Sequence, residues 1–177
     1  KLLLTFAPFS LFLYPGFALL ALGLALFLPL LFTPVTLGGV TLDTGTMIFA
    51  ATFIMTGFQL IWFHALARLF AVRMNLLPTS ARFERLRARL SVDTACQIGA
   101  VFLLMAFLAT LASVGLWVWR GFGSMDPATM TRTASLVAVL AALGVQSVTN
   151  GFLWGLLNQS APKADVVEGS EPAHVNA

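Results

Sequence analysis

The sequence predicts an all-α membrane protein built from four transmembrane helices. Of its 177 residues, 59% are hydrophobic and only 10% are charged, and 16 are phenylalanines. A chain with a mean hydropathy of +0.92 cannot cover itself with polar side chains as an ordinary soluble domain does. The charged residues also leave four long gaps, from Lys1 to Asp43, from Asp43 to Arg68, from Asp93 to Arg120 and from Arg132 to Lys163. Each gap holds about the 20 residues that a helix needs to cross roughly 30 Å of hydrocarbon.

Four segments are the expected helices: residues 9–32, 46–67, 95–119 and 133–157. Helices satisfy their backbone polar groups internally, as the bilayer requires, and no alternation typical of a barrel strand competes with them. The first segment is too long for a signal peptide. Pro15 and Pro29 are expected near its two ends, where proline is tolerated.

The arginines are concentrated in one connection and predict the orientation of the chain. The connection between the second and third helices contains Arg68, Arg73, Arg82, Arg85, Arg87 and Arg89. By the positive-inside rule this connection is cytoplasmic, which places both termini in the cytoplasm. Tyr14, Trp62 and Trp154 then fall toward the inner ends of their helices, as interfacial anchors.

Residues 80–92 are expected to form an amphipathic helix on the inner leaflet. On a helix the apolar side chains of Phe83 and Leu86 share one stripe, while the arginines point elsewhere. The simplest role of these arginines is to determine topology by binding anionic lipid. Alternatively some of them, or Arg68 and Arg73 at the membrane edge, bind the phosphate of a lipid substrate, because the guanidinium fork suits phosphate.

The outer loops suggest an internal duplication. Residues 34–47 predict a short β-hairpin with a Gly-Gly turn, after which Asp43 or Thr44 caps the second helix. The stretch GGVTLDTGTM resembles GFGSMDPATM, which pairs Asp43 with Asp126. Further on, TGFQ resembles LGVQ, which pairs Gln59 with Gln146 at a slightly larger separation along the chain. The difference between the two separations is about one helical turn, and we expect two pseudo-repeated helical hairpins.

Polar residues inside the membrane are the next candidates, because they are costly there. Gln146 and Asn150 are placed at i and i+4 on one face of the fourth helix, and Gln59 holds the matching place in the second. Their expected role is interhelical hydrogen bonding. Gly151 and Gly155 form a GxxxG pattern on the fourth helix, which predicts close helix packing.

Catalytic and metal-binding patterns are missing from the sequence. Cys96 is the single cysteine, the chain has two histidines, and no glycine-rich phosphate loop opens a helix. We therefore expect no catalytic residue, cofactor or metal in this chain. Membrane lipids are the expected partners and nucleic acid is not, while a homo-oligomer is compatible with the sequence. Residues 1–157 form the expected transmembrane domain, and the polar residues 158–177 a disordered cytoplasmic tail.

Several stretches together resemble a known family. They are FLYPGFALLALGLALFLPL, VTLGGVTLDTGTM, TGFQLIWF, NLLPTSARFERLRARLSVD, GFGSMDPATMTR and LGVQSV, all within residues 6–157. This order resembles the C-terminal membrane domain of bacterial family 2 glycosyltransferases, relatives of dolichyl-phosphate mannose synthase. The resemblance implies a location in a bacterial inner (plasma) membrane and transfer of a sugar from a nucleotide sugar to a polyprenyl phosphate. It also implies a cytoplasmic catalytic domain upstream of Lys1, with acidic residues that hold a divalent metal.

The expected function is therefore to anchor such an enzyme and to present its lipid acceptor, with Arg68 and Arg73 as contacts of the lipid phosphate. The chain begins with Lys1 and enters the membrane almost at once, as a fragment cut after a catalytic domain would. One alternative is a stand-alone membrane protein that binds or translocates lipid-linked sugars, or a transporter subunit, since repeats are common in transporters. Another is an anchor without any ligand.

Overall fold

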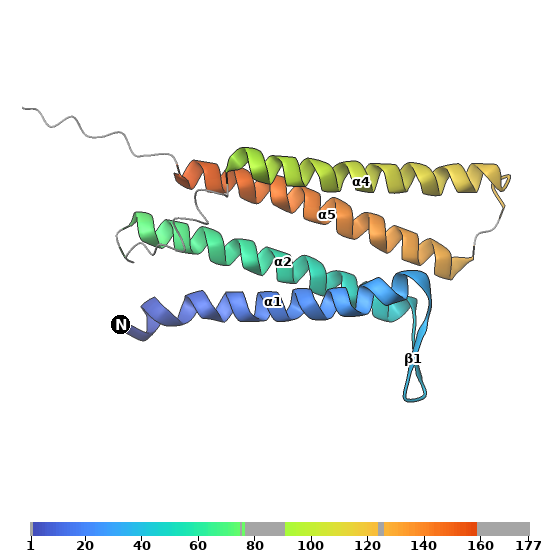
Figure 1. Cartoon of the computed structure of the whole chain (residues 1–177), viewed down its shortest axis with the longest axis horizontal. Helices are drawn as coiled ribbons and strands as arrows, with labels where there is room; N and C mark the ends of the chain where they lie inside the picture. The colour runs from blue at the N-terminus through green and yellow to red at the C-terminus, as the bar shows by residue number, and fades with distance from the viewer. Residues whose placement is uncertain (1, 75, 77–90, 124–125, 159–177) are drawn as a thin grey trace, which may run out of the picture.

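The computed structural model describes residues 2–74, 76, 91–123 and 126–158, and it confirms the four-helix prediction. The helices are α1 (Leu2–Phe32), α2 (Thr44–Arg73), α4 (Val92–Trp119) and α5 (Pro127–Asn158). They lie side by side in the order α1, α2, α5, α4 (Figure 1). The expected tail after Asn158 and nearly all of the expected amphipathic helix at 80–92 lie outside the described residues.

Two ends of the bundle can be distinguished in Figure 1. At one end, which we call the arginine end, α2 finishes at Arg73 and α4 begins at Val92. At the other, which we call the hairpin end, β1 (Val35–Leu37) and β2 (Val40–Leu42) connect α1 to α2. The two helices that lead toward the hairpin end, α1 and α4, are the outer helices of the row, and α2 and α5 form its centre.

The β-hairpin forms as predicted, with Gly38 and Gly39 as its turn. β1 and β2 pair antiparallel, with Val35 opposite Leu42 and Leu37 opposite Val40. The φ angles of Gly38 and Gly39 are 56° and 88°. Two consecutive positive φ values suit a two-residue turn whose twist matches that of the strands, and glycine adopts them without strain.

The helices are longer than the hydropathy pattern predicted, and this corrects the placement of two arginines. α2 continues past residue 67, so Arg68 and Arg73 lie on its last two turns and not in a loop. Pro15 and Pro29 are likewise inside α1, which begins at Leu2. Hydropathy marks the part of a helix that lies in hydrocarbon, whereas the helix itself continues until its backbone is capped.

Capping residues explain two of the new boundaries. Before α4, the Ser91 hydroxyl accepts a hydrogen bond from the Thr94 backbone N–H at 3.1 Å. Before α5, the Asp126 carboxylate accepts one from the Thr129 N–H at 3.0 Å, and Pro127 occupies the first helical position. Both are the arrangements that start a helix in water as well as in lipid.

Each helical hairpin is closed by a reciprocal pair of glycines. A Cβ atom on Gly57 of α2 would lie 2.7 Å from the carbonyl oxygen of Gly16 in α1. A Cβ atom on Gly144 of α5 would lie 3.0 Å from the carbonyl oxygen of Gly99 in α4. Such distances leave no room for a side chain, so the backbones touch at both crossings. The sequence separation of Gly16 and Gly99 equals that of Asp43 and Asp126. The separation of Gly57 and Gly144 equals that of Gln59 and Gln146, so the crossings follow the predicted duplication.

The slip of about one helical turn between the repeats has a structural origin. Beyond the crossing, α1 runs from Gly16 only to Phe32, whereas α4 continues from Gly99 to Trp119. Likewise α2 begins at Thr44, and α5 begins at Pro127, farther ahead of its own crossing glycine. Both helices of the second hairpin are therefore about one turn longer on the side of the hairpin end, roughly 6 Å for each helix.

The buried core lies in two parts. The larger part is at the hairpin end and centres on Phe27, Leu30, Met47 and Ile54, with Val139 from α5. The smaller part is at the arginine end. There Trp154 of α5 and Leu69 of α2 pack together, and Trp154 is only 1% exposed. The prediction of Trp154 as an interfacial anchor is therefore wrong, because α2 covers the indole that a lone helix would present to the membrane surface.

Candidate functional site

The arginine end carries the two arginines that the sequence singled out. Arg68 and Arg73 are both half-buried on the last turns of α2, and Arg73 is the final helical residue. Cations in the last turn compensate the negative end of the helix dipole. Around them Phe70, Met74 and Leu76 are 47%, 56% and 62% exposed. Guanidinium groups among exposed apolar side chains are typical of the headgroup level of a bilayer.

The polar residues of the two central helices meet only in part. The Asn150 side chain donates a hydrogen bond to the Gln59 side-chain oxygen at 3.2 Å, which joins α5 to α2. Asn150 is buried. Gln146, one turn away, has a buried side-chain oxygen for which the described residues supply no hydrogen-bond partner. The structure thus brings Gln59 and Asn150 together and leaves Gln146 outside this contact.

The sequence analysis missed an ion pair that joins the two helical hairpins. Arg132 lies just after the extra first turn of α5, residues 127–130, and its guanidinium is 3.2 Å from the Asp43 carboxylate. A second N–H of the same guanidinium points to the carbonyl oxygen of Phe32, at the end of α1, at 3.4 Å. Asp43 occupies the N-cap position of α2 but makes no side-chain capping hydrogen bond. The predicted cap at Asp43 is therefore wrong, because the carboxylate turns to Arg132 instead.

Asp126, the repeat equivalent of Asp43, does cap its helix. Its carboxylate accepts hydrogen bonds from both the backbone N–H and the hydroxyl of Thr129, each at 3.0 Å. These bonds, first the one from the Thr129 backbone and then the one from its hydroxyl, hold the pKa of Asp126 below its usual value. The Asp126 carboxylate therefore keeps its charge to a lower pH than an ordinary carboxylate does.

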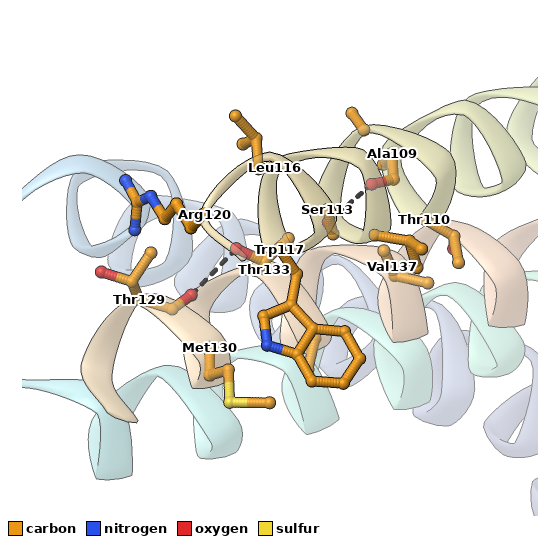
Figure 2. Close-up of a pocket in the computed structure, with 13 residues that line it drawn as sticks. Ala109, Thr110, Ser113, Leu116, Trp117, Arg120, Thr129, Met130, Thr133 and Val137 are labelled. Carbon is orange, nitrogen blue, oxygen red and sulfur yellow. Dashed lines mark hydrogen bonds between the residues drawn. The ribbon is translucent and has the colours of Figure 1, made fainter. Parts of the chain in front are cut away.

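A groove lies between α4 and α5, toward the hairpin end. Its volume is about 510 Å³, within the range of roughly 300–1,000 Å³ typical of small-molecule sites. Figure 2 shows Arg120 and Thr129 at one end of the groove and Thr110 and Val137 at the other. The remaining lining includes Ala109, Ala112, Ser113, Val114, Leu116, Trp117, Met130, Thr133 and Ala134. No sequence motif predicts this groove, because its walls come from two helices that run in opposite directions.

The indole of Trp117 is held in place by the turn that follows α4. Its N–H donates a hydrogen bond to the carbonyl oxygen of Gly123 at 3.2 Å, and its ring packs edge-on against Phe122, with 5.1 Å between the centroids. Phe122 has a φ of 58°, a left-handed conformation that is rare for a bulky residue. The turn therefore accepts local strain while it fixes Trp117 as a wall of the groove.

In the part of the chain that the structure describes, no group of three His, Cys, Asp or Glu side chains comes together to hold a metal ion. The divalent metal implied by the sequence resemblance does not fit any residues described in this chain.

The sequence of this four-helix membrane domain is similar to that of a known protein family. The family model described as the glycosyltransferase family 2 C-terminal transmembrane region matches residues 65–158, just over half of the chain. The chain belongs to this family. The match begins at the last turns of α2, which carry Arg68 and Arg73, and it includes both helices of the groove.

One curated relative supports the same assignment. The chain is 32% identical over 163 residues to the low-salt glycan biosynthesis hexosyltransferase Agl6 of Haloferax volcanii. The alignment covers 90% of this chain and 37% of that relative, so the chain spans just over a third of the relative's length. No solved structure matches the chain. Membership of the glycosyltransferase family 2 C-terminal transmembrane regions is thus what the sequence resemblance predicted.

Proposed function

We propose that this domain holds a polyprenyl phosphate acceptor at its arginine end, where the phosphate binds Arg68 and Arg73. The observation that carries the proposal is the placement of both guanidinium groups on the last turns of α2, among exposed apolar residues. A polyprenyl phosphate combines a long apolar chain with an anionic head. That end of the bundle offers a matching combination of apolar surface and fixed positive charge.

The family and the relative support an acceptor of this kind. The relative is named a hexosyltransferase of glycan biosynthesis, and the family model is a glycosyltransferase region. A sugar donor in water and an acceptor in lipid have to meet at the membrane surface, and the arginine end is such a surface. We further propose that this end is cytoplasmic by the positive-inside rule, and that the catalytic residues and their divalent metal belong to a domain outside this chain.

Binding of polyprenyl phosphate to the full chain in detergent micelles tests this proposal. Because a charge-assisted hydrogen bond contributes about 1.5–3 kcal/mol, we expect the double variant Arg68→Ala/Arg73→Ala to bind about 30-fold more weakly or worse. Lysine at both positions keeps the charge but not the fork and should give an intermediate affinity.

The matched control is the corresponding polyprenol, which has the same chain without the phosphate. Its binding should be equal in the unmodified chain and in the double alanine variant. The proposal is wrong if both variants bind polyprenyl phosphate as tightly as the unmodified chain. The orientation of the variants in membranes, measured by the accessibility of cysteines introduced at the two ends of the bundle, has to be unchanged, since these arginines also contribute to topology.

A further inference from the structure

The space between α4 and α5 exists because two large side chains of the first hairpin have small counterparts in the second. In the register that pairs Gly16 with Gly99, Phe27 corresponds to Thr110 and Leu30 to Ser113. Phe27 and Leu30 are 3% and 2% exposed and fill the hairpin end of the first repeat. Thr110 and Ser113 line the groove instead. A packed interior leaves few gaps, so a groove of this size is a departure that calls for an occupant.

The hydroxyl groups and the indole N–H of the lining are satisfied within the protein. The hydroxyls of Thr110, Ser113 and Thr133 each donate to a carbonyl oxygen one turn earlier in their own helix, at 2.8, 2.7 and 2.9 Å. The Trp117 N–H is occupied by Gly123. Because these donors are already used, their side chains present mainly carbon atoms to the groove. The lining therefore suits a hydrocarbon chain.

The charged end of the groove lies where the membrane span ends. Arg120 directly follows the last residue of α4, and it lines the same end as Thr129 (Figure 2). The planar fork of its guanidinium matches a phosphate. A molecule that fits both regions has an apolar chain along the helices and an anionic head at the membrane surface.

The groove is also open toward lipid. Only 6% of the most apolar window of α4 is buried within the protein, compared with 33% for α2 and for α5. Val114, Leu116 and Trp117 line the groove and are 49%, 50% and 41% exposed. A lipid of the surrounding leaflet can therefore enter from the side without a rearrangement of the helices.

We propose that the groove between α4 and α5 is a site for an anionic glycerophospholipid, with one acyl chain between Thr110, Ser113 and Ala134 and the phosphate on Arg120. The site lies at the hairpin end, away from Arg68 and Arg73, and it does not depend on the function proposed above. A bound phospholipid fills the volume that Phe27 and Leu30 fill in the first hairpin, and it supports a hairpin whose own side chains leave that volume open.

Photolabelling of the full chain tests the site. The chain is placed in phosphatidylcholine nanodiscs that contain a small fraction of phosphatidylglycerol with a diazirine in one acyl chain. After irradiation, labelled peptides are located by mass spectrometry. We expect label on residues 109–117 and 130–137 about tenfold above that on Val101 and Met105, which also face lipid. Even labelling along all lipid-facing positions would overturn the proposal.

Two variants sharpen the test. Thr110→Phe/Ser113→Leu copies the first hairpin into the second and should lower labelling of the groove by about tenfold. Ala100→Phe adds an aromatic ring to an exposed position of α4 that does not line the groove, and it should leave the labelling unchanged. Equal labelling in the two variants contradicts the proposal.

The head group is tested separately. Arg120→Gln should lower labelling by the phosphatidylglycerol probe severalfold, and labelling by a phosphatidylcholine probe, whose phosphate is neutralised by its own choline, by much less. An equal effect on both probes would remove the preference for an anionic lipid from the proposal, and no effect on either probe would remove the phosphate contact. Displacement of the phosphatidylglycerol probe from the groove by added polyprenyl phosphate would overturn the phospholipid as the occupant.

Discussion

In the first hairpin, α1 and α2 stay packed from the Gly16/Gly57 crossing to the β-hairpin, whereas in the second, α4 and α5 enclose a groove beyond the equivalent Gly99/Gly144 crossing. The crossings are alike because glycine lets the backbones touch in both. Beyond them the large side chains Phe27 and Leu30 fill the first hairpin, and the second lacks them. A crossing thus sets how two helices meet, while side-chain volume further along decides whether they remain in contact.

The difference extends to the loops. The second hairpin is about one turn longer at this end, and Arg132, which follows the extra turn of α5, reaches across to Asp43 of the first. The equivalent aspartate, Asp126, remains with its own helix. One hairpin is therefore closed by its own core, and the other is held by an ion pair and, in our proposal, by lipid.

Exchange of the filling residues should have the largest effect. Phe27→Thr/Leu30→Ser gives the first hairpin the small residues of the second. Since both side chains are buried, we expect the free energy of unfolding to fall by about 4 kcal/mol or more. It can be measured by titration with a denaturing detergent. The same photoactivatable phospholipid should then begin to label α1 and α2.

Leu28→Ala is the control for this exchange, because Leu28 is 54% exposed to lipid on the same helix. It should change the free energy of unfolding by less than about 1 kcal/mol. A loss as large as that of the double variant would mean that the packing of the hairpin end does not distinguish the two repeats.

The glycine crossings should differ by a smaller amount. A Cβ atom on Gly57 would lie 2.6 Å from the backbone nitrogen of Leu20. A Cβ atom on Gly144 would instead have the side chain of Leu103 as its nearest neighbour, at 2.7 Å. A side chain can move and a backbone cannot, so Gly57→Ala should cost about 3 kcal/mol and Gly144→Ala about 1 to 2 kcal/mol.

Gly115→Ala is the matched control, because a Cβ atom at this helical position meets nothing within 4 Å. The same detergent titration should show no loss of stability for this variant, since alanine favours a helix. Equal losses at Gly57 and Gly144 would indicate that the two crossings are equally rigid.

The two equivalent aspartates should show the smallest effects, and effects of different kinds. Asp43→Asn breaks a partly exposed ion pair and should lower the free energy of unfolding by about 0.5 kcal/mol, an effect that high salt removes. Asp126→Asn should instead loosen the first turn of α5, seen as faster hydrogen exchange of the Thr129 amide. If high salt removed the effect of Asp126→Asn on hydrogen exchange as fully as it removes the effect of Asp43→Asn on stability, the two aspartates would not differ in role.

The cap at Asp126 also predicts a pH dependence. Because the pKa of Asp126 is lowered in the folded chain, chiefly by the Thr129 backbone N–H, the charged cap stabilises the helix above the ordinary carboxyl pKa. This contribution is lost as the pH falls through the lowered value. The protection factor of the Thr129 amide should therefore fall in acid, below about pH 4, and that of the Thr94 amide, capped by the neutral Ser91, should not.

The sequence by itself determined the features that depend on short stretches of chain. Hydropathy identifies four membrane helices, Gly38 and Gly39 specify the β-hairpin, and the matched pairs Asp43 with Asp126 and Gln59 with Gln146 reveal the repeat. Helix ends were predicted less well, because apolar composition reports the depth of the membrane and not the residue at which the backbone is capped.

Only the tertiary structure decided which residues meet across the two repeats. It placed α2 and α5 at the centre of the row, buried Trp154 against Leu69, and turned the Asp43 carboxylate from its helix to Arg132. The tertiary structure also decided the groove, since its walls are formed by residues of α4 and α5 that no pattern along the chain connects. Such contacts depend on how much volume each side chain leaves to a partner on another helix, and hydropathy carries no information on that volume.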